Sequence, residues 1–421
     1  MSLHVHKYGG TSVGDLDRIE AVADRVVRAR QEGHTVAVVL SAMAGETDRL
    51  TQMGLSLSEH PFDREMDVLL SAGEQVSIAL LAIALQSRGV PSRSFLGGQI
   101  KVTTDRNHQR AKIEAIETTH LRKSIEAGEV PVIAGFQGMT PEGDITTIGR
   151  GGSDTSAVAI AAALEADECR IYTDVDGVYT ADPRIVDDPL LLKEVTCEEM
   201  LELASSGTKV LHERAVQYAQ KYKVPVRVLS SFNDGEGTVV HSDEEENQIE
   251  DMEQPVVTGV SLTNNEAKLT VIDAPDVPGV AWQILGPCGE KGIIIDMIVQ
   301  NTGREQKADF SFTVQQADYL AAMHLLEQTI SELSEHAEGF VGTKVVGNEH
   351  IAKVTVVGVG MRSHANVATK MFRVLSEENI NIQMISTSEI KISVVIDKQY
   401  GELAARVLAN AFDLTGNIDF K

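Results

Sequence analysis

Apolar residues in positions 1–230 follow two alternating patterns. Short continuous runs, such as 36–41 and 130–136, are typical of parallel strands buried on both faces of a sheet. Between them, apolar positions recur at helical spacing, which predicts helices such as 15–31 and 62–88. This alternation predicts an α/β fold, a three-layer αβα sandwich around a mostly parallel sheet. Further strands are predicted at 3–8, 170–173 and 224–229, the last closing the sheet, and further helices at 198–204 and from about 205 to 222.

From residue 256 onward the pattern changes to a βαββαβ unit that occurs twice. Residues 267–346 form the first copy and 352–412 the second, and Gly292–Ile298 echoes Asn379–Ile385. Internal repetition of this unit predicts two ferredoxin-like domains. The second copy lacks its last strand, so we expect the unassigned strand 256–263 to complete it. The predicted boundaries are 1–245 for the first domain, a turn-rich and acidic linker over 233–255, then 264–347 and 348–421.

Composition narrows the class of protein. The 421 residues carry a net charge of −25, which argues against nucleic acid or an anionic membrane as a partner. The cysteines Cys169, Cys197 and Cys288 lie far apart, so neither a disulfide framework nor a zinc site is predicted. No signal peptide opens the chain and its apolar runs are too short for a membrane span, so we expect a cytoplasmic protein.

A glycine-rich loop at residues 149–152 is the strongest chemical feature. A short strand, 145–148, precedes it, and Ser153 and Asp154 follow as expected N-cap residues of a helix that runs to Leu164. Backbone N–H groups and the positive end of the helix dipole would meet there, which suits an anion, and Arg150 adds a guanidinium that can bind a carboxylate or phosphate. The alternative is an ordinary βα turn.

Other polar positions fit phosphoryl transfer. Lys7 and Lys209 lie at glycine-bearing turns, and Asp174 lies at the carboxyl end of a strand. Glu74, in an apolar helix, suggests a buried carboxylate with a cationic partner, either a substrate amino group or a structural ion pair. A carboxylate acceptor is already ionised at neutral pH, so no general base is needed. Magnesium would be held mainly by ATP phosphates and water, and no protein metal site is predicted; His4 and His6 are expected to be ordinary residues of one strand face.

Three motifs together resemble one enzyme family. Lys7–Ser12, Gly149–Asp154 and Tyr172–Val178, followed by the doubled repeat, are similar to the aspartate kinases (aspartokinases), whose repeats are ACT domains. The resemblance covers essentially the whole chain. It implies transfer of the ATP γ-phosphate to the side-chain carboxylate of L-aspartate, giving 4-phospho-L-aspartate, the first step towards lysine, threonine and methionine.

The resemblance also implies roles for individual residues. Lys7, Asp174 and Lys209 would be catalytic, with Glu74 on the amino group of aspartate and Arg150 on one of its carboxylates. The expected ATP-binding residues are Lys7, Gly9, Gly10, Ser41, Thr173, Asp174, Tyr179, Asp182, Arg184 and Lys209. The expected aspartate-binding residues are Thr47, Glu74, Arg150, Gly151, Gly152, Ser153 and Asp154.

Regulation is expected at the repeats. The resemblance implies feedback inhibition by lysine, threonine or both, at Asp276, Pro278, Gly279, Val280, Ile294, Asp296, Gln300, Asn381 and Thr387. The family often has Asn where Ile294 stands, and His364–Val367 replaces a frequent Pro-Gly, so which copy binds which effector stays open. ACT repeats commonly pair between chains, so a homo-oligomer is expected. Met252 resembles the internal start that some members use to make a separate regulatory subunit.

Two alternatives remain at this point. Acetylglutamate and glutamate kinases resemble the first 230 residues but lack the doubled tail and the Lys7–Ser12 opening. A pure amino-acid sensor with a decayed kinase half is a different class, against which the intact Lys7, Asp174 and Lys209 argue. Measuring nucleotide binding and identifying the phosphorylated acceptor would distinguish an aspartate kinase from these two alternatives.

Overall fold

The structure, a computed structural model, contains two compact units. It describes residues 2–207, 210–242, 257–303, 306–336, 338–359, 361 and 366–416. The N-terminal unit comprises Met1–Tyr179, Leu191–Ser205 and Lys209–Met252, and the C-terminal unit comprises Thr180–Leu190, Ser206–Thr208 and Glu253–Lys421. Lys209, Met252 and most of the acidic linker lie outside the described residues.

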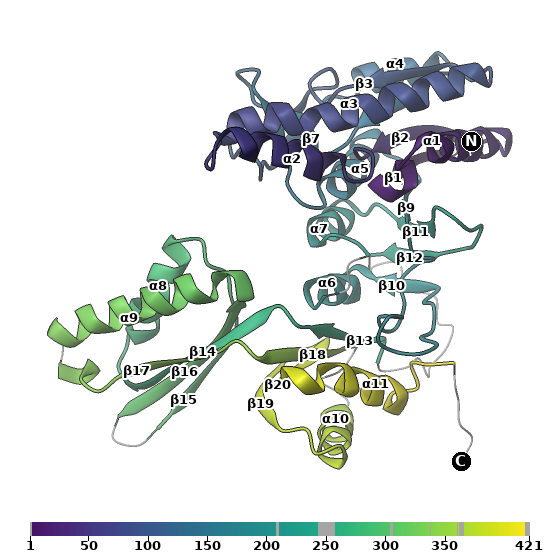
Figure 1. The fold of residues 1–421 in the computed structure, drawn as a ribbon. Coiled ribbons are helices and arrows are strands. Elements are labelled where there is room, and N and C mark those ends of the chain that lie inside the picture. The colour runs from purple at the N-terminus through teal and green to yellow at the C-terminus, as the bar shows by residue number, and fades with distance from the viewer. Residues whose placement is uncertain are drawn as a thin grey trace. The chain divides into compact units, whose positions relative to one another are not determined.

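The N-terminal unit is built on an eight-stranded sheet with the order β10-β12-β11-β9-β1-β2-β6-β3 (Figure 1). All pairings in it are parallel except β11 with β12. The mostly parallel α/β sheet is therefore confirmed. The strands are β1 (Leu3–Tyr8), β2 (Thr35–Leu40), β3 (Ser92–Phe95), β6 (Val130–Ala134), β9 (Glu168–Thr173), β10 (Glu194–Thr196), β11 (Val226–Ser230) and β12 (Thr238–His241).

Helices cover both faces of this sheet. Tyr8 of β1 packs with apolar residues of α1 (Leu16–Gln31) and α3 (Asp63–Ser87). Lys7 points to the opposite face because side chains alternate along a strand, and α5 (Gly152–Leu164) covers that face. Helix α2 (Glu46–Leu57) packs against α3, and α7 (Glu213–Tyr222) packs against α5. The remaining helices are α4 (Thr119–Glu126), next to β6, and α6 (Cys197–Ser205), next to α7. Three layers result, as predicted.

Several short strands were not predicted: β3, β4 (Val102–Thr104), β5 (Ile113–Ile116), β7 (Gln137–Met139), β10 and β12. The predicted strand at 145–148 is present as β8 (Ile145–Thr147), but it belongs to a separate small sheet of order β5-β4-β7-β8. β11 does not close the main sheet, because β12, in the predicted linker, and β10 continue it. Strands of three or four residues carry too little pattern to be recognised, since only pairing with a distant partner stabilises them.

Helix α3 passes the length and composition test for a membrane span, with a mean hydropathy of 1.9 over its most apolar window. No continuous apolar run in α3 is that long, but isolated polar residues interrupt the runs without lowering the average hydropathy much. Over half of that window, 56%, is buried inside the protein. Ile78, Leu81 and Leu85 lie in the core beneath α1. The apolar character of α3 is that of a core helix.

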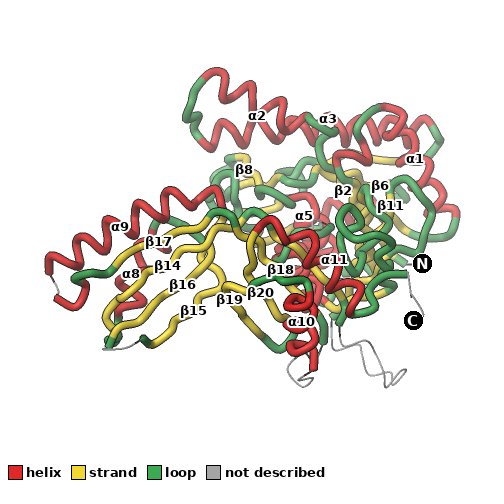
Figure 2. The backbone as a smooth tube through the Cα atoms, turned by 60° about the horizontal axis from the view of Figure 1, so that its bottom comes forward, coloured by secondary structure: helices red, strands yellow, loops and turns green. Residues whose placement is uncertain are grey.

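The C-terminal unit contains two four-stranded antiparallel sheets (Figure 2). The first repeat has the order β15-β16-β14-β17, which is that of a ferredoxin-like fold. In the second repeat, of order β13-β18-β20-β19, the place of the fourth strand is taken by β13, which precedes both repeats in sequence and pairs antiparallel with β18. The elements are β13 (Gly259–Thr263), β14 (Glu266–Pro275), α8 (Val280–Glu290), β15 (Ile295–Thr302), β16 (Lys307–Gln315), α9 (Tyr319–His336), β17 (Lys344–Asn348), β18 (Ile351–Val357), α10 (Asn366–Glu377), β19 (Ile382–Thr387), β20 (Lys391–Asp397) and α11 (Gly401–Ala411).

The segment Thr180–Leu190 packs with the C-terminal unit, although it lies in the predicted first domain. Ala181 and Val186 join the core of the second repeat. The Thr180 hydroxyl donates to the Leu414 carbonyl at 2.6 Å, and the Val260 N–H donates to the Thr180 carbonyl at 2.8 Å. A segment that follows strand β9 of the main sheet is thus built into the second repeat.

Candidate active site

Lys7 is the centre of a buried charged cluster in the N-terminal unit. Its side chain is 9% exposed, and its Nζ lies 2.5 Å from Oδ1 of Asp154 in the first turn of α5. A Cβ on Gly9 would lie 3.4 Å from the same Nζ, so the loop backbone passes close to the ammonium group. The structure therefore brings together Lys7 and Gly9, which were predicted to bind ATP, and Asp154, which was predicted to bind aspartate.

Two glycines of the 149–152 loop adopt left-handed conformations. Gly149 has a φ of 86° and Gly151 a φ of 65°, where other residues are strained. A Cβ on Gly151 would also lie 2.2 Å from Cγ of His212, and one on Gly149 would lie 2.7 Å from the Gln109 carbonyl. Chain geometry thus requires glycine at both positions.

The predicted capping of α5 by Ser153 or Asp154 was wrong. The N-cap is Gly151, without any side-chain cap, and α5 begins at Gly152. Both predicted residues are helical and make long-range contacts instead: Asp154 pairs with Lys7, and the Ser153 hydroxyl accepts a hydrogen bond from the Ser41 hydroxyl at 2.8 Å. Helix α7 likewise begins later than predicted, with His212 as its N-cap.

Two residues that the sequence analysis missed hold this loop in place. Asp67 of α3 is fully buried and accepts hydrogen bonds from Thr147 at 2.5 Å and from the Gln109 N–H at 3.1 Å. Its other oxygen lies 2.7 Å from Nδ1 of His108. From α7, the Arg214 guanidinium donates to the Ile148 carbonyl at 2.7 Å. No sequence motif marks either residue, because their partners lie far away along the chain.

Glu74 of α3 presents an unpaired carboxylate oxygen near the end of β2. Its side chain is buried, and Oε1 accepts the Ala42 N–H at 3.0 Å. Oε2 is buried without a hydrogen-bond partner, and no ion pair of Glu74 is found among the described residues. Burial raises the pKa of Glu74 to about 7, against the opposing hydrogen bond from Ala42. The structural ion pair considered above is therefore absent from the part of the chain that the structure describes.

The remaining predicted aspartate-binding residues lie in the same unit. Arg150 is exposed at the tip of the glycine loop, and its guanidinium has no partner among the described residues. Thr47 is half-buried in the first turn of α2, which begins after Gly45, a left-handed glycine. Gly10 is close-packed, since a Cβ there would lie 3.1 Å from the Ala42 carbonyl.

The predicted nucleotide-binding residues are divided between the units. Thr173 is the last residue of β9 and Asp174 follows it, and the Thr173 hydroxyl donates to Oδ1 of Asp174 at 3.2 Å. Tyr179 donates to Asp176 at 3.3 Å. Asp182 and Arg184 lie in the C-terminal unit, where Arg184 Nη2 pairs with Asp182 Oδ2 at 2.7 Å. The structure thus groups the first three with Lys7 in one unit.

Predicted effector residues cluster at the start of α8 and on β15. Gly279 caps α8 with a φ of 94°, and Asp276, Pro278 and Val280 flank it. Ile294 is 70% exposed beside β15. Gln300, Asn381 and Thr387 are exposed, whereas 362–365, at the corresponding helix start of the second repeat, lie outside the described residues.

Asp296 makes a contact that sequence alone does not indicate. Lys353 of the second repeat, 4% exposed, places Nζ 2.8 Å from Asp296 Oδ2 and 2.5 Å from Glu266 Oε1. Beside this triad, Met297 of β15 packs with Ile351, Met384 and Val395 of the second repeat. β15 and β19 lie next to each other there (Figures 1 and 2). One buried lysine thus joins the two repeats.

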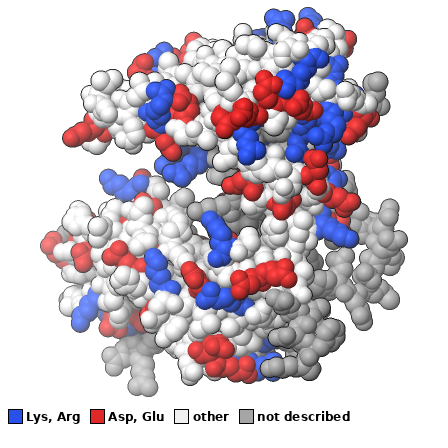
Figure 3. Space-filling view, turned by 45° about the vertical axis from the view of Figure 1, so that its right-hand side comes forward, with Lys and Arg blue, Asp and Glu red and all other residues white. Residues whose placement is uncertain are grey.

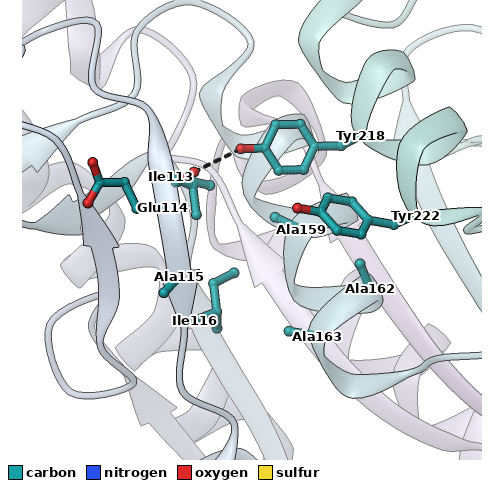
Figure 4. A pocket seen from close by; sticks show the side chains of 9 residues that line it. All are labelled: Ile113, Glu114, Ala115, Ile116, Ala159, Ala162, Ala163, Tyr218 and Tyr222. Carbon is teal, nitrogen blue, oxygen red and sulfur yellow. Dashed lines mark hydrogen bonds between the residues drawn. The ribbon is translucent and has the colours of Figure 1, made fainter.

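Other surface features do not compete with the Lys7 cluster as a catalytic site. Figure 4 shows a pocket of about 150 Å³ between β5, α5 and α7, where Tyr218 donates to the Ile113 carbonyl. Alanines and tyrosines dominate its lining, and no predicted site residue is among them. On the face drawn in Figure 3, basic and acidic side chains are interspersed, and basic side chains gather at the upper right.

Comparison with known proteins identifies the family. Residues 2–230 match the amino acid kinase family, and residues 268–353 and 354–412 each match an ACT domain. The chain is 54% identical over 414 residues to an aspartokinase of Pseudomonas aeruginosa, covering 98% of each protein.

Solved structures agree with this result. E. coli aspartokinase III in complex with aspartate and ADP, in the R-state, is similar with a TM-score of 0.79 and 26% identity, over 97% of this chain and 99% of that one. The same enzyme with lysine and aspartate, in the T-state, gives a TM-score of 0.72 and 25% identity, over 98% and 99%. By sequence, domain order and fold, this chain belongs to the aspartokinase family, amino acid kinases that carry two ACT domains.

Proposed function

We propose that this protein transfers the γ-phosphoryl group of ATP to the side-chain carboxylate of L-aspartate, giving 4-phospho-L-aspartate. The observation that carries the proposal is the buried, unpaired oxygen of Glu74 in the same unit as Arg150, whose guanidinium has no protein partner among the described residues. An amino acid offers the complementary ammonium and carboxylate groups. Family membership and the relatives with aspartate and ADP support this choice of substrates.

The chain's own residues bind, orient and neutralise charge. Lys7 supplies positive charge for the transferring phosphoryl group, and its pairing with Asp154 holds the ammonium group at the start of α5. The N–H groups of Gly10 and of Ser153 and Asp154 in the first turn of α5 can receive phosphate or carboxylate oxygens, whereas the Gly9 N–H donates to the Tyr172 carbonyl at 3.3 Å. The attacking carboxylate is already ionised, so the reaction requires positioning and no proton acceptor.

Magnesium fits this site as a nucleotide-bound ion. Among the described residues, no group of three or more His, Cys, Asp or Glu side chains could hold a metal ion. ATP phosphates and water would supply most ligands, with Asp174, exposed just after β9, as a candidate carboxylate. Bound there, the ion would neutralise charge on the phosphates.

We further propose feedback regulation by lysine, threonine or both at the repeats, in a cytoplasmic homo-oligomer. Edge strands β15 and β19 carry exposed apolar residues, Ile298 and Ile385, which supports pairing between chains. The ACT matches and the lysine complex of a relative support an amino-acid effector. A regulatory subunit that starts at Met252 is part of this proposal.

Hydroxylamine trapping of the acyl phosphate tests the reaction. With MgATP and L-aspartate we expect hydroxamate, and less of it when lysine and threonine are added. Hydroxamate from glutamate or acetylglutamate but not from aspartate would move the assignment to a sister kinase. ATP binding without product from any acceptor would favour the alternative of an amino-acid sensor with an inactive kinase half.

Arg150 provides a sharper test of the aspartate site. We expect Arg150→Ala to raise the KM for aspartate by about 10- to 100-fold, the loss of one charge-assisted contact, with little change in the KM for ATP. Arg122→Ala, at an exposed arginine of α4, serves as the matched control and should change neither. Equal increases in both KM values for Arg150→Ala would refute its assignment.

A further inference from the structure

A second polar pocket lies on the other side of the main sheet from the Lys7 side chain. It has a volume of about 300 Å³ and lies between α1 and the segment that follows β11. Tyr8 forms part of its wall. Because Lys7 and Tyr8 are neighbours in β1, their side chains point to opposite faces of the sheet. This pocket is therefore separate from the Lys7–Asp154 cluster.

Three arginines of one helix face line the pocket. Arg18, Arg25 and Arg28 are seven and three residues apart on α1, a spacing that places them on the same side. The Arg18 guanidinium lies over the Phe232 ring, 4.3 Å from its centroid, and Arg25 lies 5.0 Å from the centroid of the Tyr172 ring. The aromatic faces hold both guanidinium groups in fixed positions.

Protein carboxylates do not fully compensate these charges. Asp234 is shared, 3.0 Å from Arg28 and 3.6 Å from Arg25. The other carboxylate in the lining, Asp24, already accepts a hydrogen bond at 2.7 Å from Arg88, which lies outside the lining. Among the described residues, no carboxylate pairs with Arg18. A chain of net charge −25 thus keeps a positive excess at this pocket.

Neutral donors complete the lining. Ser12, 2% exposed, and Ser231 place their hydroxyl oxygens 2.5 Å apart in the pocket wall. Arg25 reaches the Ser231 and Asn233 carbonyls only at 3.5 and 3.4 Å, so its guanidinium has weak acceptors that a better one can replace. Guanidinium groups beside hydroxyls form the donor set that proteins use for phosphate oxygens.

We propose that this pocket binds a small phosphate-type oxyanion, either inorganic phosphate or a phosphomonoester. The bound anion would contact Arg18 and Arg28 and replace the long contacts of Arg25. Ser12 lies in the short 3-10 helix Gly10–Val13, which begins directly after Gly9, and the Ser231 N–H donates to the Thr173 carbonyl at 2.8 Å. A bound anion would therefore contact segments next to Gly10 and Thr173, two of the predicted ATP-binding residues.

Calorimetric titration of the full-length protein tests the proposal. The catalytic site is first saturated with a non-hydrolysable ATP analogue and L-aspartate, and inorganic phosphate or glycerol phosphate is then added. We expect saturable binding of at least one of the two anions, weakened about tenfold or more by Arg18→Gln, the loss of one charged contact. Arg30→Gln, on the same helix but donating to the Gly128 carbonyl at 3.0 Å, should bind as the parent does.

The outcomes separate clearly. Binding lost in Arg18→Gln but kept in Arg30→Gln supports the site, and the preferred anion shows whether the ligand is free phosphate or a phosphorylated metabolite. No binding of either anion, or equal weakening in both variants, would overturn the proposal. If Arg18→Gln does not fold, Arg28→Gln replaces it, because that side chain is more than half exposed. The titration measures anion binding and not turnover. A failure of the proposed kinase activity would instead appear in the hydroxylamine assay.

Discussion

Glu74 shows how burial can prepare a single residue for a ligand. An isolated buried carboxylate opposes folding in its ionised form, which is why its pKa rises from 4.5 to about 7. An ammonium group at Oε2 would reverse this, since an adjacent opposite charge favours the ionised form. In its ionised form the residue opposes folding of the free protein, and in its proposed role it would become favourable when the ammonium group of aspartate binds.

This reasoning gives a pH-dependent stability prediction. The pKa is higher in the folded state, so protonated Glu74 contributes its full stability below about pH 4.5, and the contribution is lost as the pH rises to about 7. We expect Glu74→Gln to be more stable than the parent by up to about 3 kcal/mol at neutral to alkaline pH. Urea unfolding at a series of pH values checks this, and the two curves should converge in acid.

Substrate affinity should respond in the opposite direction. The KM for aspartate should rise as the pH falls below about 7, because the protonated carboxyl no longer attracts an ammonium group. Glu74→Gln should show a high KM with little pH dependence. A variant that keeps the parent KM and its pH profile would separate Glu74 from aspartate binding.

Among the elements, the glycine loop before α5 depends on its backbone conformation. We expect Gly151→Ala to lower kcat/KM for aspartate about 100-fold or more, because the Cβ would be strained at a φ of 65° and would clash with His212. Gly128→Ala is the matched control, since its φ of 78° is also positive but a Cβ there meets nothing within 4 Å. Similar kinetics for the two variants would contradict the role of the loop. Steady-state kinetics with variable aspartate decide between these outcomes.

The junction between the two repeats rests on one buried cation. Burial lowers the pKa of Lys353, but the carboxylates of Glu266 and Asp296 outweigh it and raise the pKa. We expect Lys353→Met to destabilise the C-terminal unit by about 3–5 kcal/mol, since it leaves Glu266 buried without its partner. Thermal unfolding measures this.

Lys268→Met is the control, at a half-buried lysine of β14. It should change stability by less than about 1 kcal/mol. A comparable loss in both variants would mean that the triad has no special role. If lysine or threonine binds near Asp296, Lys353→Met should also change the concentration of that amino acid required for half-maximal inhibition.

At the scale of the whole molecule, the exposed apolar edge of β15 predicts association. Ile298 is 56% exposed on this edge strand, and we expect Ile298→Asp to shift the protein to a smaller assembly. Light scattering coupled to size-exclusion chromatography measures the mass. Leu320→Asp, 75% exposed on α9, should leave the mass unchanged. A monomeric parent protein, or a loss of mass in both variants, would exclude pairing through β15.

The sequence by itself determined what depends on local pattern. Long helices such as α3, the continuous central strands and the duplicated βαββαβ unit follow from apolar periodicity. Lys7 and the glycines of residues 149–152 could be singled out from their residue types and local spacing. Even β13 could be assigned to the second repeat, because one unit lacked a strand and one strand lacked a unit.

Tertiary structure alone decided what depends on distant partners. Ser153 and Asp154 were predicted to cap α5, but Gly151 is the N-cap, because the Ser153 and Asp154 side chains contact Ser41 and Lys7 instead. Asp67 and Arg214 bear no motif, yet they hold the loop through partners 42 to 103 positions away. Long-range hydrogen bonds and ion pairs, unlike periodicity, leave no trace in the neighbouring sequence. The same is true of Lys353 and of the three arginines on α1.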